Sequence, residues 1–330
     1  MTLRVGSELL PDDAHARHGR LRTYFCDIDA EAVRIDGGWR LDLAWSSDPE
    51  RHVDNKIRDA LSAWGGIGLD DMATARRRSG RVQTSLYDTW SLLTWCEWAD
   101  RAKPAPTERI TILHLDDHRD LMSPRLAIEG DELVDMITDE PFHVMESVSV
   151  LSACDSGAVG MGSFLTPFLL AFPNCDVRQL CQPPKADGTY DWRFRAAVER
   201  DDLLRPGVAR PAIALEKAKG TGPGRYRSTN DVEDWLADIG DGPVLLHVDM
   251  DYFNNRYDGD GDWMDRMRGL DPPLELVLRQ IDKVCAAMRD KGLIERIEDA
   301  AVAFSPGFFP SEMWQPADAR LRQNLASLYE

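Results

Sequence analysis

Two apolar runs that end in aspartate constrain the fold of this chain more than any other feature. The first covers residues 109–116 (RITILHLD) and the second residues 242–251 (GPVLLHVDMD). A short continuous apolar run followed by charged residues is typical of a buried strand in a parallel sheet. Helical patterns alternate with these runs, most clearly over residues 274–291. We therefore predict an α/β fold, a three-layer α-β-α arrangement with a mainly parallel central sheet.

The chain shows no internal repeat and no clear linker. Its 330 residues predict a single domain over residues 1–330. Within it, we expect residues 1–80 to form peripheral strands and a helix, including a hairpin that turns at residues 36–38. Residues 181–230 are rich in proline and glycine, and we expect an irregular excursion over the surface there.

The formal net charge of −18 argues against nucleic acid as a partner, because binding to phosphates requires clustered cations. An acidic protein suits divalent metals or substrates that carry a guanidinium group. The six cysteines form no CxxC pair, and the longest apolar run, residues 164–172, contains Pro167 and is too short to cross a bilayer. These features predict a cytoplasmic protein with no membrane partner, and they are compatible with a homo-oligomer.

The first candidate site follows the first apolar run. Asp116, His118 and Asp120 form an Asp-x-His-x-Asp pattern at the predicted strand end. Period-two geometry would place these three side chains on one side, with Asp117 and Arg119 facing away. Two carboxylates and an imidazole are a ligand set that suits Mn²⁺ or Zn²⁺.

The second candidate site ends the other run, where Asp249 and Asp251 lie two residues apart. Several carboxylates in one strand-end pocket repel one another, which raises their pKa values unless cations are present. Two divalent ions would relieve the repulsion. His114 and His247 each precede a metal-binding aspartate by two residues, and we expect them to support the site or pack in the core rather than bind metal.

Three longer segments carry a resemblance to a known family. The segments HLDDHRDLMSP, HVDMDYFNNRYDGDGDW and FSPGFFPSEMW resemble the peptide arginases of the arginase/deacetylase (ureohydrolase) superfamily. The resemblance spans roughly residues 85–315. It implies a hydrolase that converts arginine residues of a ribosomally made precursor peptide to ornithine. In that chemistry two Mn²⁺ ions activate water, and urea is released.

The resemblance also implies roles for the individual residues. Asp116 and Asp249 would bridge the two metal ions. Asp120 would bind the first ion, whereas His118 and Asp251 would bind the second. Asp120 would also carry a proton to the leaving amine.

The chain departs from the arginase pattern at two motifs. The Gly-Gly-Asp-His segment that supplies a first-metal ligand is absent, and Asp88 is the best substitute. Residues 155–160 retain the Ser-Gly of the arginase proton-shuttle motif but not its histidine, which leaves His143 as a candidate shuttle. Loss of this motif, which binds the backbone groups of free arginine, fits a peptide substrate. Glu312 is the candidate carboxylate partner of the guanidinium group.

Two other functions remain open at this stage. One is a zinc-dependent, deacetylase-like amidohydrolase, although the chain lacks the His-His pair and the tyrosine region of those enzymes. The other is a non-catalytic, metal-stabilised protein that binds basic peptides. The acidic residues 258–262 lack the spacing of a calcium loop, and we expect a mobile loop that meets a basic peptide.

Overall fold

A nine-stranded sheet forms the centre of the molecule. The computed structural model describes residues 1–46, 52–218, 223–259, 263–265 and 271–330. The strands of the large sheet are β4 (Arg76–Ser79), β5 (Val82–Ser85), β6 (Thr111–Leu115), β10 (Asp176–Leu180), β11 (Tyr190–Arg200), β12 (Ala209–Lys217), β13 (Arg225–Thr229), β14 (Val244–Asp249) and β15 (Ile297–Ala303). Their order is β12-β11-β13-β10-β6-β14-β15-β5-β4, parallel from β13 to β5 and antiparallel at both edges. The prediction of an α/β fold with a mainly parallel sheet is confirmed.

The two apolar runs are neighbouring strands at the centre of this sheet. Every residue of β6 and of β14 is buried. The strands pair in parallel, with His114 opposite His247. Their carboxyl ends therefore meet at one edge of the sheet, which is where ligands bind in open parallel sheets.

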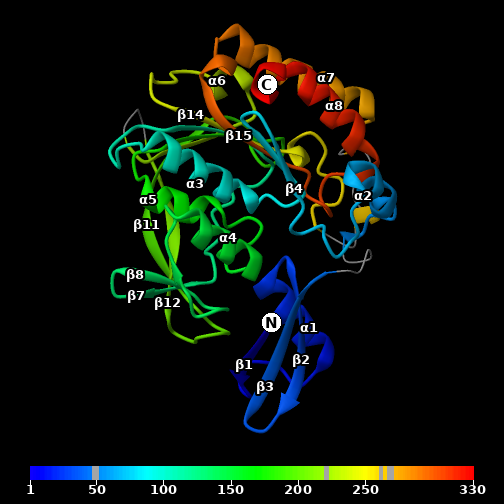
Figure 1. Cartoon of the computed structure of the whole chain (residues 1–330), viewed down its shortest axis with the longest axis vertical. Helices are drawn as coiled ribbons and strands as arrows, with labels where there is room; N and C mark the ends of the chain where they lie inside the picture. The colour runs from blue at the N-terminus through cyan, green and yellow to red at the C-terminus, as the bar shows by residue number, and fades with distance from the viewer. Residues whose placement is uncertain (47–51, 219–222, 260–262, 266–270) are drawn as a thin grey trace.

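Helices pack around the sheet (Figure 1). They are α1 (Ala14–Phe25), α2 (Ile57–Gly65), α3 (Trp90–Ala102), α4 (Ser147–Ser156), α5 (Leu165–Ala171), α6 (Val232–Trp235), α7 (Leu274–Asp290), α8 (Trp314–Asn324) and α9 (Ala326–Tyr329). The tryptophans of α3, Trp90, Trp95 and Trp98, are all buried, as expected for core packing. Among the described residues, none of these helices has the length and apolar character needed to span a bilayer.

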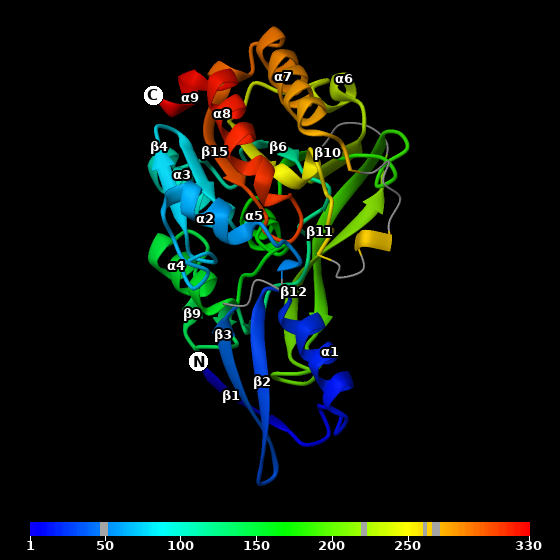
Figure 2. The ribbon, with the colours of Figure 1, turned by 90° about the vertical axis from the view of Figure 1, so that its right-hand side faces the viewer.

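The N-terminal residues form a unit of their own at one end of the molecule (Figures 1 and 2). Strands β1 (Thr2–Gly6), β2 (Ile28–Ile35) and β3 (Gly38–Trp45) make a separate antiparallel sheet of order β1-β3-β2, accompanied by α1. The predicted hairpin at residues 36–38 is confirmed as the connection of β2 to β3. A third small sheet consists of β7 (Leu126–Glu129), β8 (Glu132–Asp135) and β9 (Pro141–Phe142).

The prediction of an irregular excursion over residues 181–230 is wrong. This segment contains β11, β12 and β13, which extend the large sheet on one side. Strand β11 is mostly exposed or half-buried, so no apolar run marks it in the sequence. Antiparallel strands that face water on one side tolerate this polar composition. The proline and glycine residues of the segment lie mainly in the turns, and residues 219–222 lie outside the described part of the chain.

Contacts of Arg125 and Gly157 hold the N-terminal unit against α4 and the start of β7. The buried Arg125 guanidinium donates to the carbonyl oxygens of Tyr24, Phe25 and Gly157. Gly157 ends α4 in the left-handed region, with φ of +79°. A Cβ atom at this position would lie 1.9 Å from Cδ1 of Ile28. The Ser-Gly pair that resembles the arginase motif therefore closes a helix and packs against β2.

Replacing Gly157 by alanine tests this packing. We expect Gly157→Ala to lower the free energy of unfolding by about 2–3 kcal/mol, because it adds both a positive-φ penalty and a clash with Ile28. The control is Gly188→Ala, where an added Cβ meets nothing within 4 Å. Urea denaturation measures both. Equal stability of the two variants would contradict the packing role of Gly157.

Candidate metal centre

A cavity of about 800 Å³ opens at the carboxyl edge of the large sheet. Its wall is unusually acidic. The aspartates that line it are Asp27, Asp88, Asp117, Asp120, Asp249, Asp251 and Asp258. They come from the turn after α1, the segment before α3, the loop after β6, and the end of β14 with the loop that follows it. Such a wall favours a cationic occupant.

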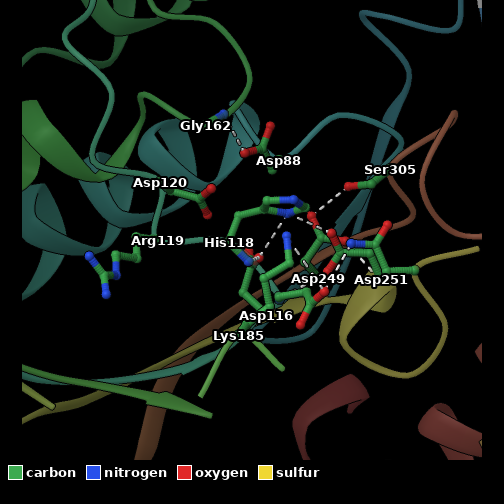
Figure 3. Close-up of polar contacts among 12 residues, drawn as sticks. Asp88, Asp116, His118, Arg119, Asp120, Gly162, Lys185, Asp249, Asp251 and Ser305 are labelled. Carbon is green, nitrogen blue, oxygen red and sulfur yellow. Dashed lines mark hydrogen bonds and ion pairs between the residues drawn. The ribbon is translucent and has the colours of Figure 1, made fainter. Parts of the chain in front are cut away.

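The loop after β6 does not continue the strand. Strand β6 ends at Leu115, and Asp120 has a φ of +53°, so period-two alternation does not apply to residues 116–120. The expectation that Asp117 faces away is therefore wrong. Asp117 is buried, lines the cavity, and donates its backbone N–H to Oδ1 of Asp251. The side chain of Arg119 extends over the ring of Trp192, and Arg119 also lines the cavity (Figure 3).

The end of β14 holds its two aspartates in a tight turn. A 3₁₀ turn, η2 (Met250–Tyr252), follows Asp249 directly. Oδ1 of Asp249 accepts a hydrogen bond from the backbone N–H of Asp251 at 3.0 Å. Its Oδ2 accepts one from the hydroxyl of Ser305, in the loop after β15, at 2.5 Å (Figure 3). Asp249 is thereby fixed between two neighbouring strand ends.

One group of potential ligands combines Asp116, His118 and Asp251. Their ligand atoms all lie within 4.8 Å of one another. Nδ1 of His118 is 2.8 Å from Oδ2 of Asp251 and 3.6 Å from Oδ1 of Asp116. Nε2 of His118 faces Oδ1 of Asp258 at 3.1 Å. The structure therefore brings together three of the predicted metal ligands.

A second group lies deeper and combines His114, Asp116, Asp120 and His247, whose ligand atoms also lie within 4.8 Å of one another. We expected the two histidines to support the site or pack in the core, and the structure instead includes them among the potential ligands. Asp116 belongs to both groups: Oδ1 faces His118, and Oδ2 faces His247 at 3.5 Å. A carboxylate in this position can bridge two ions.

Unpaired polar atoms in this cluster fit a bound cation. Oδ1 of Asp88, Oδ2 of Asp116, Oδ2 of Asp120 and Nε2 of His247 are buried and have no hydrogen-bond partner among the described residues. Each unpaired buried polar atom costs about 1–3 kcal/mol, and more when it is charged. Divalent cations bound by these oxygen and nitrogen donors would offset that cost. The buried cluster could therefore hold metal ions.

The electrostatics of the cluster support the same conclusion. Burial, together with repulsion from neighbouring aspartates, raises the pKa values of Asp88, Asp116 and Asp249 well above their usual range. Burial alone would lower the pKa of His118, but the carboxylates of Asp251 and its other neighbours raise it far above the usual value. Without a cation, these side chains therefore keep their protons to higher pH than freely exposed ones.

Asp88 lies beside the two groups rather than within them. It is buried and lines the cavity, and its Oδ2 accepts a hydrogen bond from the backbone N–H of Gly162 at 2.8 Å. Asp249 also lies outside both groups. The metal-binding roles of these two residues remain predictions.

The structure does not place Glu312 or His143 at the cavity. Glu312 is exposed and pairs with Arg256 at 2.5 Å. His143 is exposed near the start of α4, where its backbone N–H donates to Ser149. Neither belongs to the cavity wall. In the acidic segment, Asp258 lines the cavity, whereas residues 260–262 lie outside the described part of the chain.

Sequence reasoning missed cavity residues from the N-terminal part of the chain. Arg22 and Asp27, at the end of α1, line the wall, and so does His52. They reach the cavity only because the N-terminal unit docks on the main sheet. No local pattern in the sequence signals such a long-range contact.

The raised pKa values predict how metal binding depends on pH. A carboxyl group with a raised folded-state pKa stabilises the fold below its unfolded value near 3.9. That contribution is lost as pH rises through the folded value. Cations replace the protons, so we expect the increase in Tm caused by Mn²⁺, relative to chelator, to grow from about pH 5.5 to about pH 8. Thermal unfolding measures it, with Asp116→Asn as the control that loses the increase. A constant or declining increase would contradict the cluster's electrostatics.

Comparison with known proteins identifies no family for this chain. No model of a known protein family matches the chain, and no curated protein matches it significantly in sequence. The candidate function therefore depends on the buried histidine and aspartate cluster, which could hold metal ions and is compatible with a metal-dependent hydrolase.

Proposed function

We propose that this protein is a dinuclear metal-dependent hydrolase that converts arginine residues of a peptide to ornithine with release of urea, a peptide arginase of the arginase/deacetylase superfamily. The observation that carries the proposal is the pair of ligand groups that share Asp116. They lie at the carboxyl ends of β6 and β14, the two central parallel strands. The three-layer arrangement typical of that superfamily is part of the same proposal.

The two ions are proposed to be Mn²⁺. The resemblance implies which residues would bind each of them. Asp116 and Asp249 would contribute to holding both ions, Asp120 would bind the first, and His118 and Asp251 would bind the second. Asp88 is the further candidate for the first ion. When bound, such a pair of ions lowers the pKa of water towards about 7 and so supplies a nucleophile at neutral pH.

The cavity suits a side chain with a cationic tip and an apolar stem. Its acidic floor complements a guanidinium group. Its wall also includes the apolar side chains of Leu121, Met122, Met161 and Phe308. Met122 is 51% exposed, so apolar surface remains open for the aliphatic part of an arginine. At about 800 Å³ the cavity also has room for peptide on either side of that arginine.

Asp120 is the proposed proton carrier to the leaving amine. Its Oδ2 is buried and unpaired among the described residues. Hydrolysis adds water across the bond between the guanidinium carbon and Nε, so one proton from water must reach Nε. A carboxylate beside the nucleophile can take that proton and return it to the leaving group.

Mass spectrometry of arginine-containing peptides tests the proposal. With the Mn²⁺-loaded protein we expect a loss of about 42 Da per modified arginine and an equal amount of urea, because the two-metal reaction removes the guanidinium carbon with two nitrogens. Asp116→Asn and Asp249→Asn should abolish the change. Asp131→Asn, in the exposed turn after β7, is the matched control. Intact peptides after incubation with the metal-loaded protein would refute the arginase assignment, and release of acetate from acetylated peptides would favour the amidohydrolase.

Variants of Glu312 and His143 test whether these two residues, which the sequence suggested, take part in the reaction. Glu312→Gln and His143→Ala should each retain kcat/KM within about twofold of the unmodified protein, because neither side chain lines the cavity. Steady-state urea release measures this. A decrease of about tenfold or more in either variant, at unchanged Tm, would show that the residue acts in the reaction.

A further inference from the structure

We propose that His247 supplies the remaining protein ligand of the first metal ion. This inference depends on the proposed two-metal site but not on the identity of the substrate. His247 lies within β14. The inference gives it the role of first-metal ligand for which the sequence pattern suggested Asp88.

Three unpaired atoms face one another at this position. Nε2 of His247 lies 3.5 Å from Oδ2 of Asp116. Both atoms, and Oδ2 of Asp120, are buried without a hydrogen-bond partner among the described residues. All three side chains belong to the group whose ligand atoms lie within 4.8 Å of one another. Two carboxylate oxygens and an imidazole nitrogen are donors that Mn²⁺ and Zn²⁺ accept.

The surroundings of His247 orient its ring for this role. Nδ1 lies 3.2 Å from the hydroxyl of Ser91, which can accept the Nδ1 proton and leave the Nε2 lone pair facing Asp116. Metal-binding histidines usually have such a partner on the other ring nitrogen. Phe164 stacks on the ring at 4.9 Å with an interplanar angle of 10°, and Trp95 packs against it edge-on. The ring is therefore held in one orientation.

His114, the other histidine of this group, is arranged differently. Its Nε2 lies 3.3 Å from the carbonyl oxygen of His118, an acceptor that requires a proton on Nε2. A protonated ring nitrogen cannot bind a metal ion. His114 thus holds the loop that carries His118, and only His247 directs a free lone pair into the group.

Asp88 has a buried Oδ1 that is unpaired among the described residues, but it lies outside both groups of potential ligands. Its Oδ2 is bound to the backbone N–H of Gly162. It nevertheless lines the cavity wall. Asp88 therefore faces the space where a substrate would bind.

Metal stoichiometry of the full-length protein tests the assignment. After chelation, reloading with Mn²⁺ and desalting, elemental analysis should find two ions in the unmodified chain and one in His247→Asn. Asp88→Asn and His114→Asn should both retain two. The electron paramagnetic resonance signal of spin-coupled Mn²⁺ should give way to a mononuclear signal in His247→Asn alone. Circular dichroism checks that each variant is folded.

A milder variant covers the case in which His247→Asn does not fold. Ser91→Ala keeps the imidazole but removes its partner on Nδ1, and it should weaken binding of the first ion by about 10–100-fold. Two tightly bound ions in His247→Asn, loss of one ion in Asp88→Asn, or unchanged affinity in Ser91→Ala would each overturn the assignment. These measurements do not depend on turnover. Two bound ions without arginine hydrolysis would refute the proposed function and leave the role of His247 intact.

Discussion

Repulsion among buried carboxylates is the constraint on which the rest of this site depends. Strands β6 and β14 pair in parallel register, so their carboxyl ends bring Asp116, Asp249 and Asp251 to one edge of the sheet. Burial makes each negative charge costly, and the neighbouring charges increase that cost. Protons or metal ions can neutralise the cluster, and metal ions would also coordinate its unpaired atoms. Because the pairing of the apolar central strands brings these buried aspartates together, their cluster favours the binding of cations.

The N-terminal unit also contributes to the cavity that contains these aspartates. Arg125 binds the end of α1 and the carbonyl oxygen of Gly157, just before the loop whose Gly162 N–H holds Asp88. The unit also places Arg22 and Asp27 in the cavity wall. Its docking therefore shapes both the opening of the cavity and the position of one of its carboxylates.

The sequence predicted those parts of the structure whose local pattern reflects burial. The apolar runs at β6 and β14 stand out because parallel central strands are buried on both faces, and α7 shows clear helical periodicity. Strand β11 was missed because most of its residues are exposed or half-buried, so no apolar run marks it in the sequence. Glu312 and His143 do not line the cavity, and the sequence could not indicate this because loop direction depends on long-range packing. The position of His247, two residues before Asp249 on the same face of a buried strand, predicted that it lies near the site but not that it belongs to a group of potential ligands.

Anomalous X-ray scattering from crystals grown with Mn²⁺ tests the central claim most directly. We predict two peaks on opposite sides of the Asp116 carboxylate, separated by roughly 3.5–4 Å as in other two-metal sites. One peak would be within bonding distance of Asp120 and His247, and the other within bonding distance of His118 and Asp251. Crystals that show no anomalous density in the cluster at saturating Mn²⁺ would mean that protons neutralise these carboxylates, which would contradict a metal centre.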